Sequence, residues 1–108
     1  MSQPFTNRHG TVTLHFHSKV PGFIADRWGA FTPNASHIYI ASDTIAGFWL
    51  AHEFGHIQQA KRLGWRYLPW IAWTYLAGGP YASTAEKDAT AWAWRHFNDF
   101  PSEVRADD

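Results

Sequence analysis

The sequence contains no cysteine among its 108 residues, so disulfides and thiolate metal ligands are excluded. Neither charge sign is in excess, because nine Lys and Arg balance nine Asp and Glu. The chain therefore lacks the basic surface typical of nucleic-acid-binding proteins, and we expect no nucleic-acid partner. It also lacks a membrane-spanning apolar run and a signal-peptide core, which predicts a cytoplasmic location by default, with export by other routes left open.

A chain of 108 residues is long enough for one domain with a modest core. Seven Trp and eight Phe supply large rings, which build such a core from few residues. We expect a single domain over residues 1–108, with the polar segments 1–10 and 101–108 as flexible ends. The sequence does not indicate an oligomeric state.

The first forty residues have the pattern of a small β-sheet. Apolar and polar side chains alternate from Thr11 to His17, which is typical of a half-buried strand. Residues 22–24 and 28–31 are candidates for two further short strands in a stretch interrupted by Pro and Gly. His15 and His17 share one side of the first strand, where solvated side chains are favoured over a metal-binding pair.

A helix-like stretch in the middle of the chain contains the pattern H-E-x-x-H over residues 52–56. On an α-helix His52 and His56 lie one turn apart on one face, so both imidazoles can bind a single ion. Neutral imidazole is a preferred zinc ligand, and Glu53 on the flank of that face can accept a proton from a water that zinc activates. The pattern predicts a catalytic zinc site with Glu53 as general base.

The helix around this pattern is expected to begin near Asp43, with Ser42 as N-cap, and to run to Leu63, where Gly64 ends it. Its apolar side chains lie on two opposite sides, which indicates a buried helix. Gly55 costs about 1 kcal/mol relative to Ala in a helix interior, so its presence indicates a close approach by another backbone.

An aromatic segment follows from Trp65 to Ala77. Pro69 suits the first turn of a second helix, and the Gly-Gly-Pro run at 78–80 predicts its end. The segment is too short to span a bilayer, which takes about 20 apolar residues, but Trp and Tyr also suit a membrane surface. We favour a packed helix or a lid over the zinc site, and keep membrane-surface contact as the alternative.

A last helix is expected from about Ala85 to Phe97, with Ser83 or Thr84 as its cap. One face of this helix begins with an acid and continues with small and apolar side chains. These residues are Glu86, Ala89, Thr90, Ala93 and Phe97.

A catalytic zinc takes three protein ligands, so a third ligand must come from outside the central helix. Glu53 is assigned as the base and Glu103 lies in the polar tail, which leaves Glu86 as the predicted third ligand. The fallback ligands are Asp88, His96 and His37.

The motifs H-E-F-G-H at 52–56 and E-K-D-A at 86–89 resemble the gluzincin branch of zinc metallopeptidases. Together with R-L-G-W-R-Y-L-P they look like a group of small bacterial zincin-like proteins, over about residues 45–97. The resemblance implies a minimal zincin-like α+β fold, with a small twisted N-terminal sheet packed on the central helix and two further helices. It also implies one Zn²⁺ per chain, a peptide or protein substrate, and a bacterial or phage origin.

Two positions bear on how far this resemblance extends. Many gluzincins carry an Asp four residues after the ligand Glu to orient a histidine, and here that residue is Thr90. Loss of such support typically costs about 10–100-fold in affinity or activity.

The segment His37–Ile40 has the place of the edge strand that holds an extended peptide in zinc peptidases, or else it is one more strand of the sheet.

The function implied is peptide hydrolysis by a zinc-activated water, with Glu53 as general base. A further donor is needed for the oxyanion, and the candidates are His96, Tyr81, Tyr75 and Arg95. The alternative is a zinc-stabilised binding or structural module, inactive or latent, with the aromatic segment 65–81 as its partner surface. Thr90 favours this alternative, whereas Glu53, which a structural site does not need, favours the enzyme.

Overall fold

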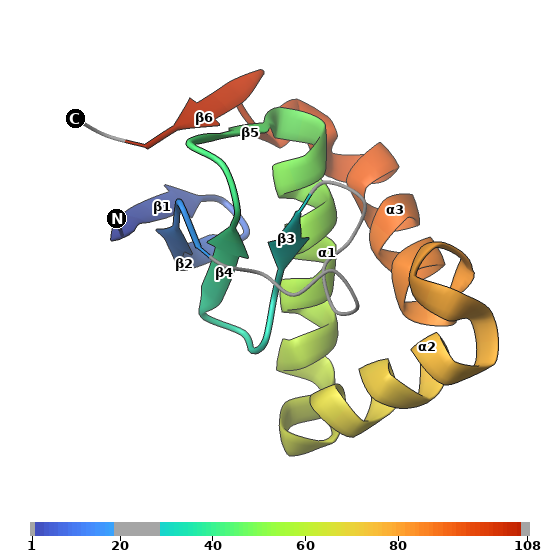
Figure 1. The fold of residues 1–108 in the computed structure, drawn as a ribbon. Coiled ribbons are helices and arrows are strands. Elements are labelled where there is room, and N and C mark those ends of the chain that lie inside the picture. Colours follow the sequence, from blue (N-terminus) through green and yellow to red (C-terminus); the bar gives the residue numbers. More distant parts are fainter. Residues whose placement is uncertain (1, 19–28, 107–108) are drawn as a thin grey trace.

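The computed structural model describes residues 2–18 and 29–106, without the side chains of residues 79–82. In this part of the chain a four-stranded sheet and a two-stranded sheet combine with three α-helices, so the predicted α+β class is confirmed. Figure 1 shows helix α1 in the centre, with the larger sheet on one side and α3 on the other. Among the described residues, no helix is long and apolar enough to cross a membrane.

The larger sheet has the strand order β1-β2-β4-β3. Strands β1 (Ser2–Asn7) and β2 (Gly10–His15) form an antiparallel hairpin. Residues 2–10 are therefore a paired strand and its turn, whereas their polarity predicts a flexible end. The predicted strand at 11–17 is confirmed as β2, although it ends before His17, which has a positive φ of 57° and is exposed.

Strand β4 (His37–Ile40) is parallel to β2 on one side and antiparallel to β3 (Ala30–Phe31) on the other. Of the two alternatives that the sequence leaves open for residues 37–40, the structure has the ordinary sheet strand and not the edge strand, because both backbone edges of β4 are already paired. Within the described residues, the strand predicted at 28–31 is present as β3. The one expected at 22–24 lies outside the described residues.

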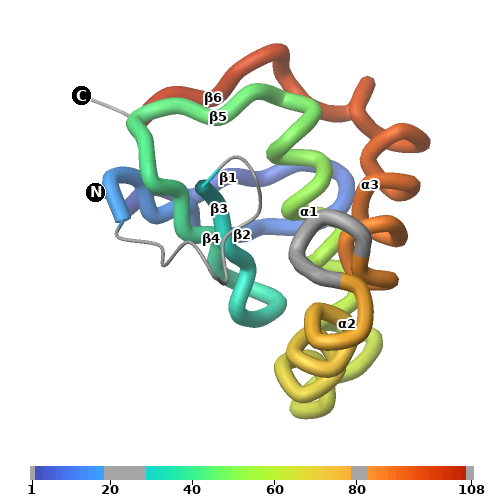
Figure 2. The backbone as a smooth tube through the Cα atoms, turned by 45° about the vertical axis from the view of Figure 1, so that its right-hand side comes forward, coloured from blue at the N-terminus to red at the C-terminus, as the bar shows by residue number. Residues whose placement is uncertain are grey.

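A second pairing joins the start of the central helix to the C-terminal segment. Strand β5 (Thr44–Ala46) is antiparallel to β6 (Glu103–Arg105), and Figure 2 shows the two running side by side. Helix α1 consequently begins at Gly47 without a side-chain cap, so the predicted start at Asp43 with Ser42 as N-cap is wrong. Residues 103–106 are likewise held in the fold, because Ala106 also donates its N–H to the Asp43 carbonyl (2.8 Å).

Helix α1 (Gly47–Leu63) is buried on both sides, as its sequence predicts. One side packs on the apolar face of the sheet, and the other packs on α3 (Thr84–His96). The two helices approach closely at Gly55, where a Cβ would lie 2.7 Å from the Cα of Ala89. The predicted backbone approach at Gly55 is confirmed, and it brings the start of α3 beside the two motif histidines. The core comprises Val12, Leu14, Phe16, Ala30, Ile38, Ile40, Ile45, Leu50, Ala51, Phe54, Ile57, Ala93 and Phe100.

Helix α2 (Tyr67–Ala82) follows the short 3₁₀ turn η1 (Gly64–Arg66) and continues two residues past the predicted stop at 78–80. Its inner side packs on α1 and α3 through Tyr67 and Ile71. Its outer side leaves Trp73 and Leu76 exposed. The helix is therefore packed on one side, as predicted, and presents an apolar surface on the other.

Candidate metal centre

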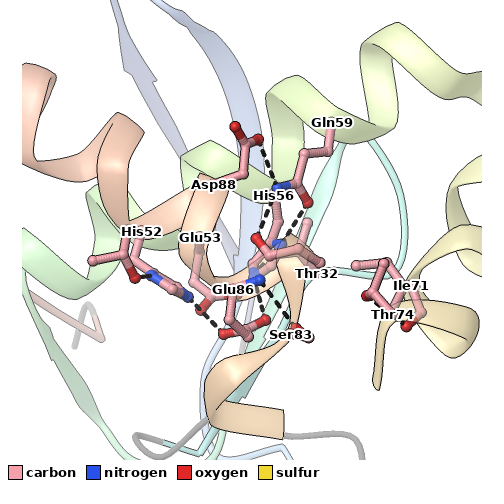
Figure 3. A network of polar contacts seen from close by, with 12 residues as sticks. Thr32, His52, Glu53, His56, Gln59, Ile71, Thr74, Ser83, Glu86 and Asp88 are labelled. Atoms are coloured by element: carbon pink, nitrogen blue, oxygen red, sulfur yellow. Dashed lines mark hydrogen bonds and ion pairs between the residues drawn. The ribbon is translucent and has the colours of Figure 1, made fainter. Parts of the chain in front are cut away.

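Three potential metal ligands meet between α1 and α3. His52 and His56 come from successive turns of α1, and Glu86 comes from the first turn of α3 (Figure 3). The Nε2 atom of His52 lies 2.9 Å from Oε1 of Glu86, and the Nε2 atom of His56 lies 2.8 Å from Oε2. All three side chains are buried, with residue exposures of 2%, 4% and 5%. The structure thus brings together the three residues that the sequence predicts as ligands.

The His56 ring is oriented by Gln59, one turn further along α1. The Gln59 amide nitrogen donates to the Ala85 carbonyl (2.9 Å) and to Oδ2 of Asp88 (3.0 Å). Its oxygen is left to accept a hydrogen bond from Nδ1 of His56 (2.8 Å). A neutral His56 that carries its proton on Nδ1 therefore points the Nε2 lone pair at the carboxylate of Glu86.

The His52 ring has a hydroxyl partner. The distance from Thr90 Oγ1 to Nδ1 of His52 is 3.1 Å, and Thr90 lies one turn after Glu86 on α3. Thr90 stands where the resemblance to gluzincins implies an Asp, and its hydroxyl contacts the ring nitrogen of His52 that does not face Glu86. The hydroxyl holds the ring in place but adds no negative charge, so it favours the metal-binding tautomer less strongly than Asp.

Glu86 is positioned by its own helix and by α2. Ser83 caps α3 by accepting a hydrogen bond from the Glu86 N–H (3.1 Å), which places the carboxylate in the first turn. The Tyr75 hydroxyl donates to Oε2 of Glu86 (2.7 Å). Burial raises the pKa of Glu86, but in the metal-free chain the hydrogen bonds and charges of His52 and His56, when Nε2 of each ring carries a proton, outweigh it, so the pKa lies below its usual range. Glu86 is thus held as a carboxylate, the form that binds a metal.

Glu53 lies beside this group and is only 1% exposed. Its Oε1 accepts a hydrogen bond from the Thr32 hydroxyl (2.7 Å), and the Thr32 carbonyl in turn accepts one from Tyr67 (2.7 Å). Burial, together with the charge of Glu53, raises the pKa of Tyr67 far above its usual value, so the phenol remains a donor. The end of β3 and the start of α2 therefore fix the predicted general base.

The donor set fits a zinc ion. Zinc bonds to imidazole and carboxylate are about 2.0–2.2 Å long, so tetrahedral donor atoms lie about 3.3 Å apart. The two nitrogen–oxygen distances, 2.9 and 2.8 Å, are a few tenths of an ångström shorter. A neutral His56 with its proton on Nδ1 would set a lone pair against a carboxylate oxygen, so a cation is required between them. A proton or a metal ion meets that requirement.

The other residues named from the sequence do not join this group. His37 pairs with His15, whose Nε2 lies 2.9 Å from Nδ1 of His37, and Asp88 contacts Gln59 instead of the ligand atoms. His96 lies about 15 Å further along α3 than Glu86, at 1.5 Å per residue, and contacts His9 and Asp99.

Among the four oxyanion candidates, the structure places Tyr75 at the cluster. Arg95 is exposed towards the far end of α3. The side chain of Tyr81 lies outside the described part of the chain. His96, the remaining candidate, belongs to a different group of side chains.

Four residues that hold the ligands or Glu53 in place are not identified from the sequence. Gln59 had a local signal, because its place three residues after His56 puts it on the same helix face. Thr32 and Tyr67 had none, since the contacts of Tyr67 with Thr32 and of Thr32 with Glu53 depend on the packing of three separate elements. For Thr90 the sequence shows only that a carboxylate is missing, not that the hydroxyl contacts His52.

Comparisons of the chain with protein families, with curated proteins and with solved structures gave no match. The chemistry of this site is therefore inferred from its own geometry.

Proposed function

We propose that the protein is a zinc-dependent metallopeptidase of the gluzincin type, built on a minimal zincin-like fold. The observation that carries this proposal is the buried Glu86 carboxylate, which faces Nε2 of both motif histidines while their Nδ1 atoms contact Thr90 and Gln59. A ligand set whose outer nitrogens are also hydrogen-bonded is typical of a metal centre.

A zinc ion held by His52, His56 and Glu86 would act as a Lewis acid, lowering the pKa of a water and polarising a peptide carbonyl. The carboxylate of Glu53 would accept the proton of that water and then donate it to the leaving amine. The Thr32 hydroxyl donates to Oε1 of Glu53 and keeps this side chain in one orientation. Tyr75 would donate to the oxyanion only after its hydroxyl released the hydrogen bond that it makes to Glu86.

The burial of the site bears on how a substrate would enter. Glu53 and Glu86 are almost fully covered, and α2 contributes to this cover through Tyr75. A peptide could reach the catalytic group only if α2 or another covering segment moved, so α2 would act as a lid. We expect low basal cleavage that rises with any treatment that displaces α2.

The alternative is a zinc-stabilised binding module that does not turn over substrate. The outer face of α2 favours it, because Trp73 and Leu76 are 69% and 84% exposed and Trp65 just before the helix is 84% exposed. Large exposed apolar side chains grouped in this way mark interaction surfaces. The partner would be a protein or a membrane surface.

Glu53→Gln separates the two functions. In a peptidase the variant should keep zinc and fold but lose about 10²–10⁴-fold in the rate of cleavage of an unstructured protein such as casein. Glu103→Gln, the same change at an exposed glutamate of β6, is the matched control and should cleave normally. No cleavage across a broad peptide library by the unaltered, zinc-loaded protein, also under treatments that displace α2, would reject the peptidase in favour of the binding module.

A further inference from the structure

A second group of two histidines and one carboxylate lies outside the candidate metal centre. It consists of His9, His96 and Asp99, and one possible ligand atom from each lies within 4.8 Å of the others. His9 sits in the turn between β1 and β2, His96 ends α3, and Asp99 ends the 3₁₀ turn η2 (Phe97–Asp99). In Figure 2 the blue turn between β1 and β2 lies beside α3. The proposed peptidase uses none of these side chains.

The geometry of this group is that of ligands around one ion. The same oxygen, Oδ2 of Asp99, lies 2.8 Å from Nε2 of His9 and 3.8 Å from Nδ1 of His96. These distances bracket the separation of about 3.3 Å expected between donors that share a tetrahedral zinc ion. The two imidazole rings are 4.9 Å apart and nearly perpendicular, so they crowd a single carboxylate oxygen from different directions.

The surroundings hold these side chains in place and leave them open to solvent. The His9 N–H donates to Asn7 Oδ1 (2.8 Å), and its carbonyl accepts from Lys61 (3.2 Å), which fixes the turn. The Trp92 ring lies 4.9 Å from the His9 ring and 4.4 Å from the His96 ring. The three side chains are 15%, 34% and 25% exposed, so an ion could enter from solvent and leave again.

One nearby cation would compete with a metal. The Arg8 guanidinium lies 3.6 Å from Oδ1 of Asp99, the oxygen that does not face the histidines. Its side chain is 75% exposed, so it can turn into solvent at little cost. The hydrogen bond from His9 also holds the pKa of Asp99 below its usual range, which keeps the carboxylate available as a ligand.

We propose that His9, His96 and Asp99 form a second, exchangeable site for a divalent transition metal such as zinc. Imidazole and carboxylate donors suit these ions, and solvent fills the remaining positions. The ion would join the β1–β2 turn to the end of α3, the helix whose first turn carries Glu86. This proposal does not depend on the peptidase function.

The test is a Zn²⁺ titration by calorimetry of the full chain, first stripped of metal with a chelator. The unaltered protein should show two binding events, and His96→Ala should lose the weaker one. His17→Asn is the matched control, because it removes an exposed histidine at a positive φ that Asn tolerates, and it should keep both. A second event that persists in His96→Ala overturns the proposal.

A measurement on the unaltered protein covers the case in which a variant fails to fold. In imidazole ¹H–¹⁵N spectra, the second equivalent of Zn²⁺ should shift the signals of His9 and His96 and leave those of His17 unmoved. Unmoved His9 and His96 signals at saturating zinc overturn the second site. A single binding event that His56→Ala abolishes also overturns it, while leaving the buried site intact, so the two sites fail in distinguishable ways.

Discussion

The two ends of α3 carry two groups with the same ligand types and opposite surroundings. At the first turn, Glu86 meets His52 and His56 in the interior, and Gln59 and Thr90 contact the outer nitrogens of these rings. At the other end, His9, His96 and Asp99 form a half-exposed group at the surface (the surface group).

Burial and support make the difference between the two groups. A carboxylate in the interior is not hydrated, so it needs a proton or a metal ion between itself and the histidines. A surface carboxylate can be hydrated, so it does not need a bound ion, and an ion bound there can exchange with solvent. The residue types alone therefore do not show which group needs a bound cation more strongly. The surroundings of the two groups show it.

The largest effect is expected from removing one imidazole from each group. His56→Ala should lose zinc from the buried site, and it leaves Glu86 short of a partner in the interior, a change that typically costs about 3–5 kcal/mol. His96→Ala should lower the melting temperature much less, because water replaces its contact. Elemental analysis and thermal melts measure both quantities. Full zinc content in His56→Ala would reject the buried metal site.

Neutralising the carboxylate of each group comes next. Glu86→Gln should weaken zinc binding by more than the roughly 10–100-fold that a supporting residue is worth. Helix content by circular dichroism should barely change, since Gln and Glu have similar helix propensity. Asp99→Asn is the parallel change in the surface group and should leave the tight binding event intact. Tight zinc binding by Glu86→Gln would remove Glu86 from the ligand set.

The histidine support can be tested with Thr90→Val, which replaces a hydroxyl by a methyl group of similar size. His52 would lose its Nδ1 partner, and zinc affinity should fall by about 10–100-fold with little change in fold. Thr11→Val, at an exposed position of β2, is the matched control and should bind zinc normally. Equal affinity in the two variants would show that the hydroxyl does not orient the ring.

Acid should destabilise the metal-free protein in part through Glu86. The pKa of Glu86 is lower in the folded chain than in the unfolded chain, so its contribution to stability is present above the ordinary carboxylate pKa of about 4.3. That contribution disappears as the pH falls through the folded value. Melting temperatures from about pH 6 to pH 2 should therefore fall more steeply for the unaltered protein than for Glu86→Gln. Parallel curves of melting temperature against pH for the two proteins would contradict a lowered pKa of Glu86 in the folded chain.

The smallest effect is expected for Arg8→Ala. The Arg8 guanidinium is largely in solvent and lies 3.6 Å from Asp99, so water and salt screen the pair. We expect no measurable change in the melting temperature and a slightly tighter weak zinc event, because a competing cation is gone. A weaker event in this variant would mean that Arg8 holds Asp99 in its ligand position.

Much of the fold follows from local patterns. The alternation in residues 11–17 is realised in β2, and the two-sided apolar pattern predicts the burial of α1. Gly55 marks the contact with α3 because a glycine in a helix interior is unfavourable unless space is short. Glu86 was reached by elimination among three glutamates, and the structure places it beside both histidines.

Pairing between distant segments explains one wrong prediction, the start of the central helix, and decides one question that the sequence leaves open, the place of residues 37–40 in the sheet. Ser42 and Asp43 look like a helix start, but the next three residues pair with β6, about sixty positions away, which delays the helix to Gly47. Residues 37–40 have a strand pattern that is the same for an edge and for an interior strand. Only the neighbours β2 and β3 decide which of the two applies.

The sequence by itself determined whatever depends on helix and strand geometry, above all His52 and His56 one turn apart and Gln59 on the same face. The tertiary structure decided the contacts of Thr32 with Glu53, 21 residues apart, and of Thr90 with His52, 38 residues apart. It also decided the surface group, in which His9 and Asp99 are 90 residues apart. The physical reason is that helical spacing is fixed by the backbone over a few residues, whereas a hydrogen bond between distant segments exists only after packing has brought them together.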